Sequence, residues 1–226
     1  MRETTTRRAV GIVVGTASLL LLLGGCITGE RPRLVTDDTI PSIDDAAIRS
    51  VVEVLARNSS DAAPPKFTIS FSVVTKFGGQ SSSASISVDP MLGTSIQFPN
   101  VRFVFALDGT TVTCSRVLDT CETGINEIFV SDRMLNSRIF KESIVSRLEQ
   151  DSRVAVGDSL PSVRNIAGWP STCAAVPVVD STGITREKSY CAFDDFGILA
   201  FMDTADLLIE ATDIRTTVDP SAFATE

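Results

Sequence analysis

The amino-acid sequence predicts an α+β fold in which an antiparallel β-sheet buries one face beneath two or more amphipathic helices. Two patterns support this prediction. Apolar and polar residues alternate through most of residues 66–114 and 165–214, as they do in strands with one buried face. Residues 43–58 and 135–150 instead repeat apolar side chains every three or four positions, which is typical of helices.

The first helix is expected over residues 43–58. Ser42 suits the N-cap position, and Asp44 and Asp45 in the first turn interact favourably with the helix dipole. The apolar face consists of Ile48, Val51, Val52 and Leu55. Two consecutive prolines at 64–65 lie beyond the expected end of this helix, where they prevent its continuation.

Strands are expected from Lys66 onward, with phenylalanine and aliphatic residues on one face and mostly Ser, Thr and Arg on the other. The segments with this alternation are 67–73, 84–88, 96–98, 101–107 and 111–114. Asp108-Gly109 is a strong hairpin signal between the last two segments. These features predict an antiparallel meander with one buried face.

A second helix is expected over residues 135–150, with a short strand before it at 128–130. Its apolar stripe consists of Leu135, Ile139, Phe140, Ile144, Val145 and Leu148. Strands return in the last third of the chain, at 153–156, 165–170, 173–178, 188–193, 198–202 and 205–214. The turn at 194–197 contains Asp194 and Asp195, which are typical turn residues, and no metal site is predicted there.

The first 25 residues have the three-part layout of a secretory signal peptide: a basic start, an apolar run and small residues before Cys26. The segment Leu23-Gly24-Gly25-Cys26 resembles the lipobox of bacterial lipoproteins. That resemblance implies that Cys26 carries a diacylglyceryl group, with palmitate or a similar acyl chain on the new amine. It also implies a cell-envelope location, anchored to the extracytoplasmic face of a bacterial membrane. Residues 26–41 would then be the lipidated Cys and a tether, and 42–226 a single domain.

An uncleaved transmembrane anchor is the alternative for this N-terminal segment. The apolar run 9–23 has about 15 residues, which is fewer than the ~20 needed to span a bilayer, and this favours the signal peptide. The sequence Thr6-Arg7-Arg8 leaves both general secretion and twin-arginine export open. It also leaves open which membrane of a double envelope would hold the anchor.

Composition narrows the possible chemistry. The net charge of −8 argues against nucleic acid as a partner. The chain has no histidine, which excludes Ser-His and Cys-His catalysis and every His-ligated metal. No serine lies in a Gly-x-Ser-x-Gly motif. We therefore expect a protein that is not an enzyme and that needs no cofactor.

Four cysteines other than Cys26 are expected to form two disulfides, because an even number in an exported domain is typical of such bonds. They are Cys114, Cys121, Cys173 and Cys191. Three connectivities are possible, of which the sequential one closes the loops 114–121 and 173–191. A four-thiolate zinc site is the alternative, but the CxxC spacing that favours zinc is missing.

The order of the C-terminal elements resembles lipoproteins of the LolA/LolB and LppX/LprG type. The segments that carry this resemblance are Ile166-Ala167-Gly168, Tyr190-Cys191, Gly197-Ile198-Leu199, Glu210-Ala211-Thr212 and Val218-Asp219. The likeness covers residues 43–223, in element order more than in identity. It implies a strongly curved sheet, a half-open β-barrel whose apolar concave face is partly closed by helices and binds lipid chains or the acyl groups of lipoproteins.

The alternation of the strands supplies candidate ligand-binding residues on the apolar face. They are Phe67, Phe71, Ile86, Phe103, Phe105 and Leu107. If the face is hollow, the chain is a lipid-anchored lipoprotein that binds or carries a lipid or acyl ligand. If it is filled, the chain is a non-enzymatic envelope scaffold or a protein-binding accessory lipoprotein, whose protein partner the sequence does not identify.

Overall fold

The computed structural model describes residues 43–57, 66–126, 128 and 130–225. The chain divides into two units, Met1–Thr39 and Ile40–Glu226, and the description below concerns the second. The predicted signal peptide, Cys26 and the tether lie outside the described residues. Within the described ranges, no helix is both long enough and apolar enough to cross a bilayer.

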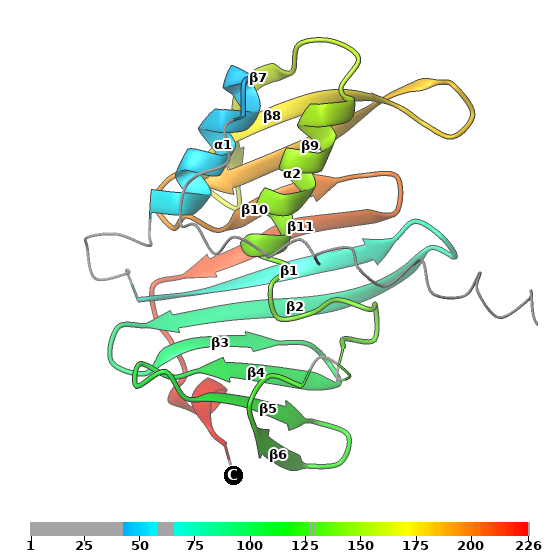
Figure 1. Cartoon of the computed structure of the whole chain (residues 1–226). Coiled ribbons are helices and arrows are strands. Elements are labelled where there is room, and N and C mark those ends of the chain that lie inside the picture. The colour runs from blue at the N-terminus through cyan, green and yellow to red at the C-terminus, as the bar shows by residue number, and fades with distance from the viewer. Residues whose placement is uncertain (1–42, 58–65, 127, 129, 226) are drawn as a thin grey trace, which may run out of the picture. The chain divides into compact units, whose positions relative to one another are not determined.

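One antiparallel sheet of eleven strands forms the centre of the fold, in the order β6-β5-β4-β3-β2-β1-β11-β10-β9-β8-β7 (Figure 1). The first meander contains β1 (Phe67–Thr75), β2 (Gln80–Asp89), β3 (Gly93–Gln97), β4 (Val101–Phe105), β5 (Thr111–Ser115) and β6 (Thr120–Thr123). The second contains β7 (Leu160–Ile166), β8 (Trp169–Val179), β9 (Thr185–Phe193), β10 (Leu199–Asp203) and β11 (Leu207–Arg215). Antiparallel pairing of β1 with β11 joins the two meanders. Because β6 and β7 lie at opposite ends, the sheet is open rather than closed.

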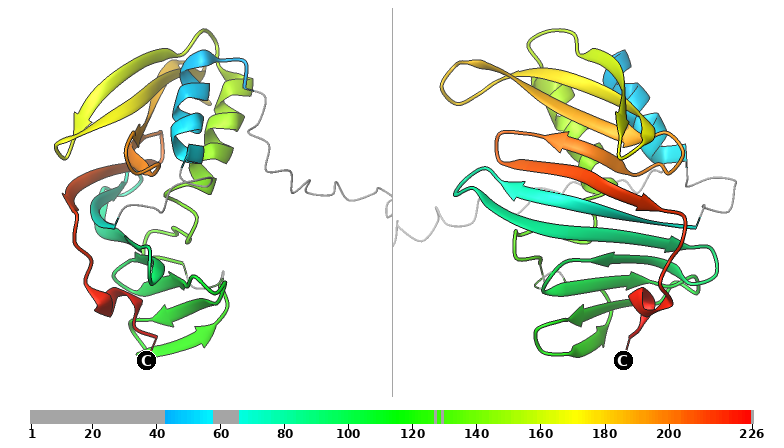
Figure 2. Two further views of the ribbon diagram at one scale, coloured as in Figure 1. Left: turned by 90° about the vertical axis from the view of Figure 1, so that its left-hand side faces the viewer. Right: turned by 180° about the vertical axis from the view of Figure 1, so that it is seen from behind.

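Two helices lie on the same face of this sheet (Figures 1 and 2). Helix α1 (Ala46–Arg57) contacts β8 and β9, and α2 (Glu142–Val154) contacts α1 and β8. Both helices therefore cover the second meander. A single open antiparallel sheet with helices on one face confirms the predicted α+β class.

The first meander is covered instead by residues 130–141, which precede α2 and which we call the covering segment. The side chain of Asn100 donates a hydrogen bond to the Val130 carbonyl, at 3.0 Å. Arg133 donates to Gln80 at 2.6 Å and to the Ser81 carbonyl at 3.0 Å. These bonds attach the segment to β2 and to the turn before β4.

Strand β1 shows why the apolar residues form a core. Phe67, Ile69, Phe71 and Val73 are buried, whereas the intervening Thr68, Ser70 and Ser72 are half-buried on the other face. The predicted hairpin at Asp108-Gly109 is also present, and Gly109 has a φ of +84°, a conformation that glycine adopts without strain.

Helix α1 starts later than predicted because Asp45 is its N-cap. The Ile48 amide donates to Asp45 Oδ1 at 3.0 Å, and the other oxygen of the same carboxylate accepts from the Ser159 amide at 3.0 Å. Asp45 thus ties the start of α1 to the residue before β7. The predicted apolar face of Ile48, Val51, Val52 and Leu55 is buried.

We expect Asp45→Ala to lower the free energy of unfolding by about 1 kcal/mol near neutral pH, as the loss of an N-cap does. Burial acts to raise the pKa of Asp45, but hydrogen bonds from Ile48 and Ser159 outweigh it and hold this pKa below 3.8. The ionised carboxylate therefore stabilises the fold above the unfolded pKa, and this contribution is lost as pH falls through the folded pKa. Urea unfolding at several pH values measures both effects. A wild-type advantage that grew on acidification would contradict this assignment.

Helix α2 begins at Glu142 rather than 135 because earlier backbone groups bind elsewhere. The hydroxyl of Ser131 accepts from the Leu135 amide, and Asn136 Oδ1 accepts from the Arg138 amide. The Phe140 carbonyl accepts from the Leu199 amide of β10 at 3.1 Å. Such local bonds compete with helix formation.

Two predicted strands near α2 are wrong. Arg153 and Val154 belong to the last turn of α2, and Ala155 forms only an isolated bridge with Val178. Ile128, expected in a strand at 128–130, lies in a turn. Val154 and Val156 satisfied the alternation expected of a strand, but α2, whose Ile144 and Leu148 pack in the core, continues to Val154.

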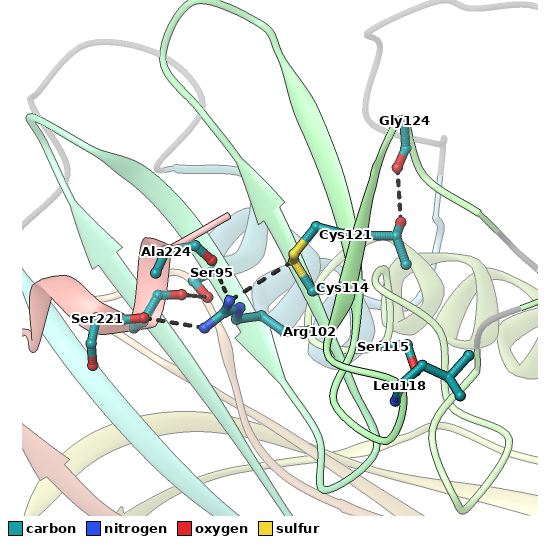
Figure 3. Close-up of a disulfide and its surroundings, with 11 residues drawn as sticks. Ser95, Arg102, Cys114, Ser115, Leu118, Cys121, Gly124, Ser221 and Ala224 are labelled. Atoms are coloured by element: carbon teal, nitrogen blue, oxygen red, sulfur yellow. Dashed lines mark hydrogen bonds between the residues drawn. A yellow bond between two sulfur atoms is a disulfide. The ribbon is translucent and has the colours of Figure 1, made fainter. Parts of the chain in front are cut away.

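The two disulfides have the sequential connectivity, Cys114–Cys121 and Cys173–Cys191. Each joins directly opposed residues of neighbouring strands, β5 with β6 and β8 with β9. Cys173 and Cys191 are buried, whereas Cys121 is exposed. Figure 3 shows the Cys114–Cys121 bridge. Two disulfides indicate an oxidising, extracytoplasmic compartment.

The difference in exposure predicts the order of reduction. A mild thiol reductant is expected to open Cys114–Cys121 first, because Cys121 is accessible while both sulfurs of the other bridge are buried. Opening this loop should lower the free energy of unfolding by about 2.5 kcal/mol on the chain-entropy estimate. Alkylation with mass spectrometry identifies the open bridge, and urea unfolding measures its effect. Equal reduction rates for the two bridges would be inconsistent with this order.

The C-terminal turn η1 (Pro220–Phe223) packs beside β3 and β4. Ser95 of β3 donates to the Ala222 carbonyl at 2.6 Å, and Arg102 of β4 donates to the carbonyls of Ser221 and Ala224 (Figure 3). These bonds hold the chain end against the first meander.

Candidate functional site

A cavity of about 350 Å³ lies between the first meander, the segment 137–142 and the turn before β10. We call it the apolar cavity. Its apolar lining consists of Phe67, Ile86, Val88, Ile96, Phe105, Phe140, Phe196 and Ile198. Its polar lining consists of Thr94, Ser137, Arg138, Lys141 and Glu142. A volume and a lining of this kind are typical of sites for small apolar ligands.

The sheet side of the cavity follows from strand register. Phe67 of β1 lies directly opposite Val88 of β2, and Ile86 of β2 lies opposite Ile96 of β3. Phe105 of β4 lies opposite Thr94 of β3. Because paired residues point to the same face of a sheet, these side chains form one continuous wall.

Residues 137–142, together with Phe196 and Ile198, form the side of the cavity opposite the sheet, which we call its roof. Aromatic contacts hold this roof in place. The Phe140 ring stacks on Phe71, with centroids 4.4 Å apart, and lies 6.2 Å from the ring of Phe98. The ring of Phe196 lies 4.7 Å from that of Phe67 and 4.9 Å from that of Trp169. The roof thus packs against residues from both meanders.

The six residues expected to contact a ligand lie in three different settings. Phe67, Ile86 and Phe105 line the apolar cavity.

Phe71 and Phe103 lie in the core, where Phe71 contacts Phe140 and Phe103 contacts Phe98. Leu107 lies in the turn after β4 with 63% of its surface exposed, because that strand ends at Phe105 and the alternation does not extend further. Contact between a ligand and any of these residues stays a prediction.

Sequence reasoning placed no site residue in the segment before α2. Arg138, Lys141 and Glu142 repeat at the spacing of one helical turn, but they lie outside the apolar stripe of the helix expected over 135–150, so alternation and periodicity did not identify them. Burial lowers the pKa of Lys141, while the charge of Glu142 opposes this shift. Because Lys141 also lines the apolar cavity, a lysine side chain lies beside its apolar wall.

A second hollow, the polar pocket, lies between α2 and β9 and has a volume of about 540 Å³. It is lined by Asn136, Arg138, Glu142, Ser143, Ser146, Arg147, Gln150, Asp151, Lys188 and Tyr190. At its base, Asp151 accepts one hydrogen bond from Tyr190 Oη and another from Lys188 Nζ, each at 2.6 Å. Burial raises the pKa of Tyr190 strongly, and the Asp151 carboxylate adds to this effect. Tyr190 is therefore a neutral hydrogen-bond donor at physiological pH.

The part of the chain that the structure describes contains no group of three or more His, Cys, Asp or Glu side chains placed to hold a metal ion. Asp194, which follows β9, accepts a hydrogen bond from the Thr172 hydroxyl at 2.6 Å. This contact accounts for one of the paired acids of the sequence as a turn residue that binds a neighbouring strand.

The comparison with known proteins gives matches among solved structures alone. No protein-family model matches the sequence, and no curated protein matches it. Similar solved structures include MucB from the MucA/MucB complex of Pseudomonas aeruginosa, at 14% identity over 79% of this chain with a TM-score of 0.38. The chain spans 59% of the length of that MucB chain.

Two further structures are covered almost completely. A LolA superfamily protein from Nitrosomonas europaea matches at 8% identity, with a TM-score of 0.35, over 77% of this chain and 95% of its own. An outer membrane lipoprotein-sorting protein domain from Vibrio parahaemolyticus matches at 9% identity, with a TM-score of 0.30, over 78% and 97%. The LolA class to which the element order is similar thus recurs among the solved structures. At these TM-scores the matches carry no argument about ligand or partner, so the function has to be inferred from the cavity of this chain.

Proposed function

We propose that the chain is a non-enzymatic lipoprotein, anchored through Cys26 to the extracytoplasmic face of a bacterial membrane, that binds or carries an acyl ligand in the apolar cavity. The observation that carries this proposal is the cavity itself, in which eight apolar side chains surround about 350 Å³. The cavity opens to solvent, so a ligand can enter it. An acyl chain is a ligand that matches a site in which eight of the thirteen lining residues are apolar.

The cavity-filling variant Ile86→Trp tests this proposal. The larger side chain projects from β2 into the apolar cavity, so we expect affinity for dodecanol to fall by about tenfold or more. The assay uses the full chain with Cys26→Ser, so that no anchor acyl chain enters the measurement. Bound lipid extracted from the same preparation is identified by mass spectrometry.

The matched control is Ser83→Trp, because Ser83 lies on the same strand but is exposed. This variant should bind dodecanol like the parent protein. A parent protein that contains no lipid and does not bind dodecanol would refute the carrier function.

A protein-binding scaffold is the second candidate, and strand β7 favours it. This strand lies at an end of the sheet, and its Leu160 and Val163 are 63% and 74% exposed. An edge strand with exposed apolar side chains can pair with a strand from another chain. In that case Val163→Asp should abolish complex formation and leave dodecanol binding unchanged.

A further inference from the structure

The apolar cavity and the polar pocket are adjacent and have two lining residues in common. Arg138 and Glu142 belong to both linings. They lie at the end of the covering segment and at the first residue of α2, where the roof of the cavity passes into the helix. An elongated molecule with one end in each hollow would pass beside these two residues.

The charges around the two hollows favour an anion, although the chain as a whole has a net charge of −8. Four cationic residues line them: Arg138, Lys141, Arg147 and Lys188. Two acidic residues, Glu142 and Asp151, line the same hollows, and a third, Asp206, lies 3.7 Å from Arg147. Four cationic against three acidic side chains leave a small local cationic excess on an acidic protein, which favours anionic ligands.

Two charged residues that line the polar pocket, Asp151 and Arg147, already have partners in the protein. Asp151 already accepts hydrogen bonds from Lys188 and Tyr190, so its charge is balanced within the pocket. Arg147 lies 3.7 Å from Asp206 in a pair whose side chains are 36% and 51% exposed, a geometry that holds the guanidinium weakly. Ser143, Ser146 and Gln150 add neutral donors along the same face of α2.

We propose that the ligand is an acyl amphiphile with a phosphate headgroup, whose chain occupies the apolar cavity and whose phosphate binds in the polar pocket beside Arg138 and Arg147. This inference rests on the proposed acyl-binding function and adds the headgroup class. Guanidinium groups pair with phosphate through two parallel hydrogen bonds, which gives both affinity and orientation. Glu142, at the junction, repels the same headgroup.

Three ligands with one chain length test the proposal: dodecyl phosphate, dodecanol and dodecyltrimethylammonium. Binding to the full chain with Cys26→Ser is measured below their micelle concentrations. We expect dodecyl phosphate to bind about tenfold more tightly than dodecanol, and the cationic amphiphile to bind most weakly. The preference for phosphate should decrease with added salt.

Two charge-neutralising variants at the junction should act in opposite directions. Arg138→Gln is expected to weaken dodecyl phosphate binding about tenfold, whereas Glu142→Gln should strengthen it by about threefold. Both residues also line the apolar cavity, so the change in dodecyl phosphate affinity should exceed the change in dodecanol affinity. Arg147→Gln, in the polar pocket alone, should weaken dodecyl phosphate binding and leave dodecanol affinity within about twofold. Arg186→Gln, in an ion pair with Asp180 on the β8–β9 hairpin, is the control and should change neither affinity.

The outcomes separate this inference from the function on which it rests. If dodecanol binds and dodecyl phosphate binds no better, the headgroup inference is overturned while acyl binding stands. If both Arg138→Gln and Glu142→Gln weaken phosphate binding, their effect is structural and the inference is likewise overturned. If dodecanol does not bind the parent protein, both are lost.

Discussion

Phe140→Ala is expected to lower the free energy of unfolding by about 3 to 5 kcal/mol, the largest effect of any substitution considered. The ring is 1% exposed and stacks on Phe71 at 4.4 Å. Its removal leaves an empty space between the covering segment and the sheet, and rigid neighbours such as Phe98 cannot fill it. Urea unfolding measures the change.

The same variant should loosen the roof of the apolar cavity before the rest of the fold. The Leu199 amide donates to the Phe140 carbonyl at 3.1 Å, so its hydrogen exchange reports on the attachment of the roof to β10. We expect its protection to decrease more than that of the β8–β9 ladder. Phe77→Ala, at a side chain 81% exposed, is the control and should stay within about 0.5 kcal/mol of wild type. An equal effect of the two substitutions would contradict the role assigned to the stacked ring.

Asp151→Ala is expected to cost about 3 to 4 kcal/mol. The carboxylate is 6% exposed and accepts from both Tyr190 and Lys188. Its loss leaves the buried Tyr190 hydroxyl without an acceptor and the Lys188 ammonium without its counter-ion. Lys188 is 25% exposed, so water compensates part of the second penalty.

The matched control for Asp151 is Asp213→Ala, which removes an ion pair with Arg215 in which both side chains are more than half exposed. Such pairs contribute at most about 1 kcal/mol. A second variant, Asp151→Ala with Lys188→Met, should recover part of the loss because it removes the unpaired charge. If the double variant were less stable than the single one, an unpaired Lys188 could not be the cause.

The sequence predicted β1 and the hairpin after β4 because their signals are local, but it placed one strand across 165–170, where β7 ends at Ile166 and β8 begins at Trp169. Alternation in β1 and the Asp108-Gly109 turn each depend on a few neighbouring residues, and the structure contains both. Helix α2 was predicted too early because the pattern over 135–141 is helical, while the backbone of this segment bonds to Ser131, Asn136 and Leu199. Only tertiary structure supplies the last of these partners.

The candidate site was harder to predict, for the same physical reason. The alternation identified Phe67, Ile86 and Phe105 as members of an apolar face, and they line the cavity. It could not distinguish them from Phe71, which faces the same way but lies under Phe140. The covering segment decides which side chains on the apolar face line the cavity and which pack against another side chain. The alternation of the strands carries no information about where that segment lies.

The pairing of β1 with β11 has a consequence for how the chain reaches its folded state. Strand β1 pairs with β2, which is near in sequence, but its second ladder joins residues 68–75 to residues 207–215, which are far away in sequence. Contacts between such distant positions slow folding. In a chain that is synthesised from its N-terminus, the first meander emerges with the long edge of β1 unpaired. That edge is open to aggregation until residues 207–215 are available to pair with it, so the last strand decides when the two meanders can join.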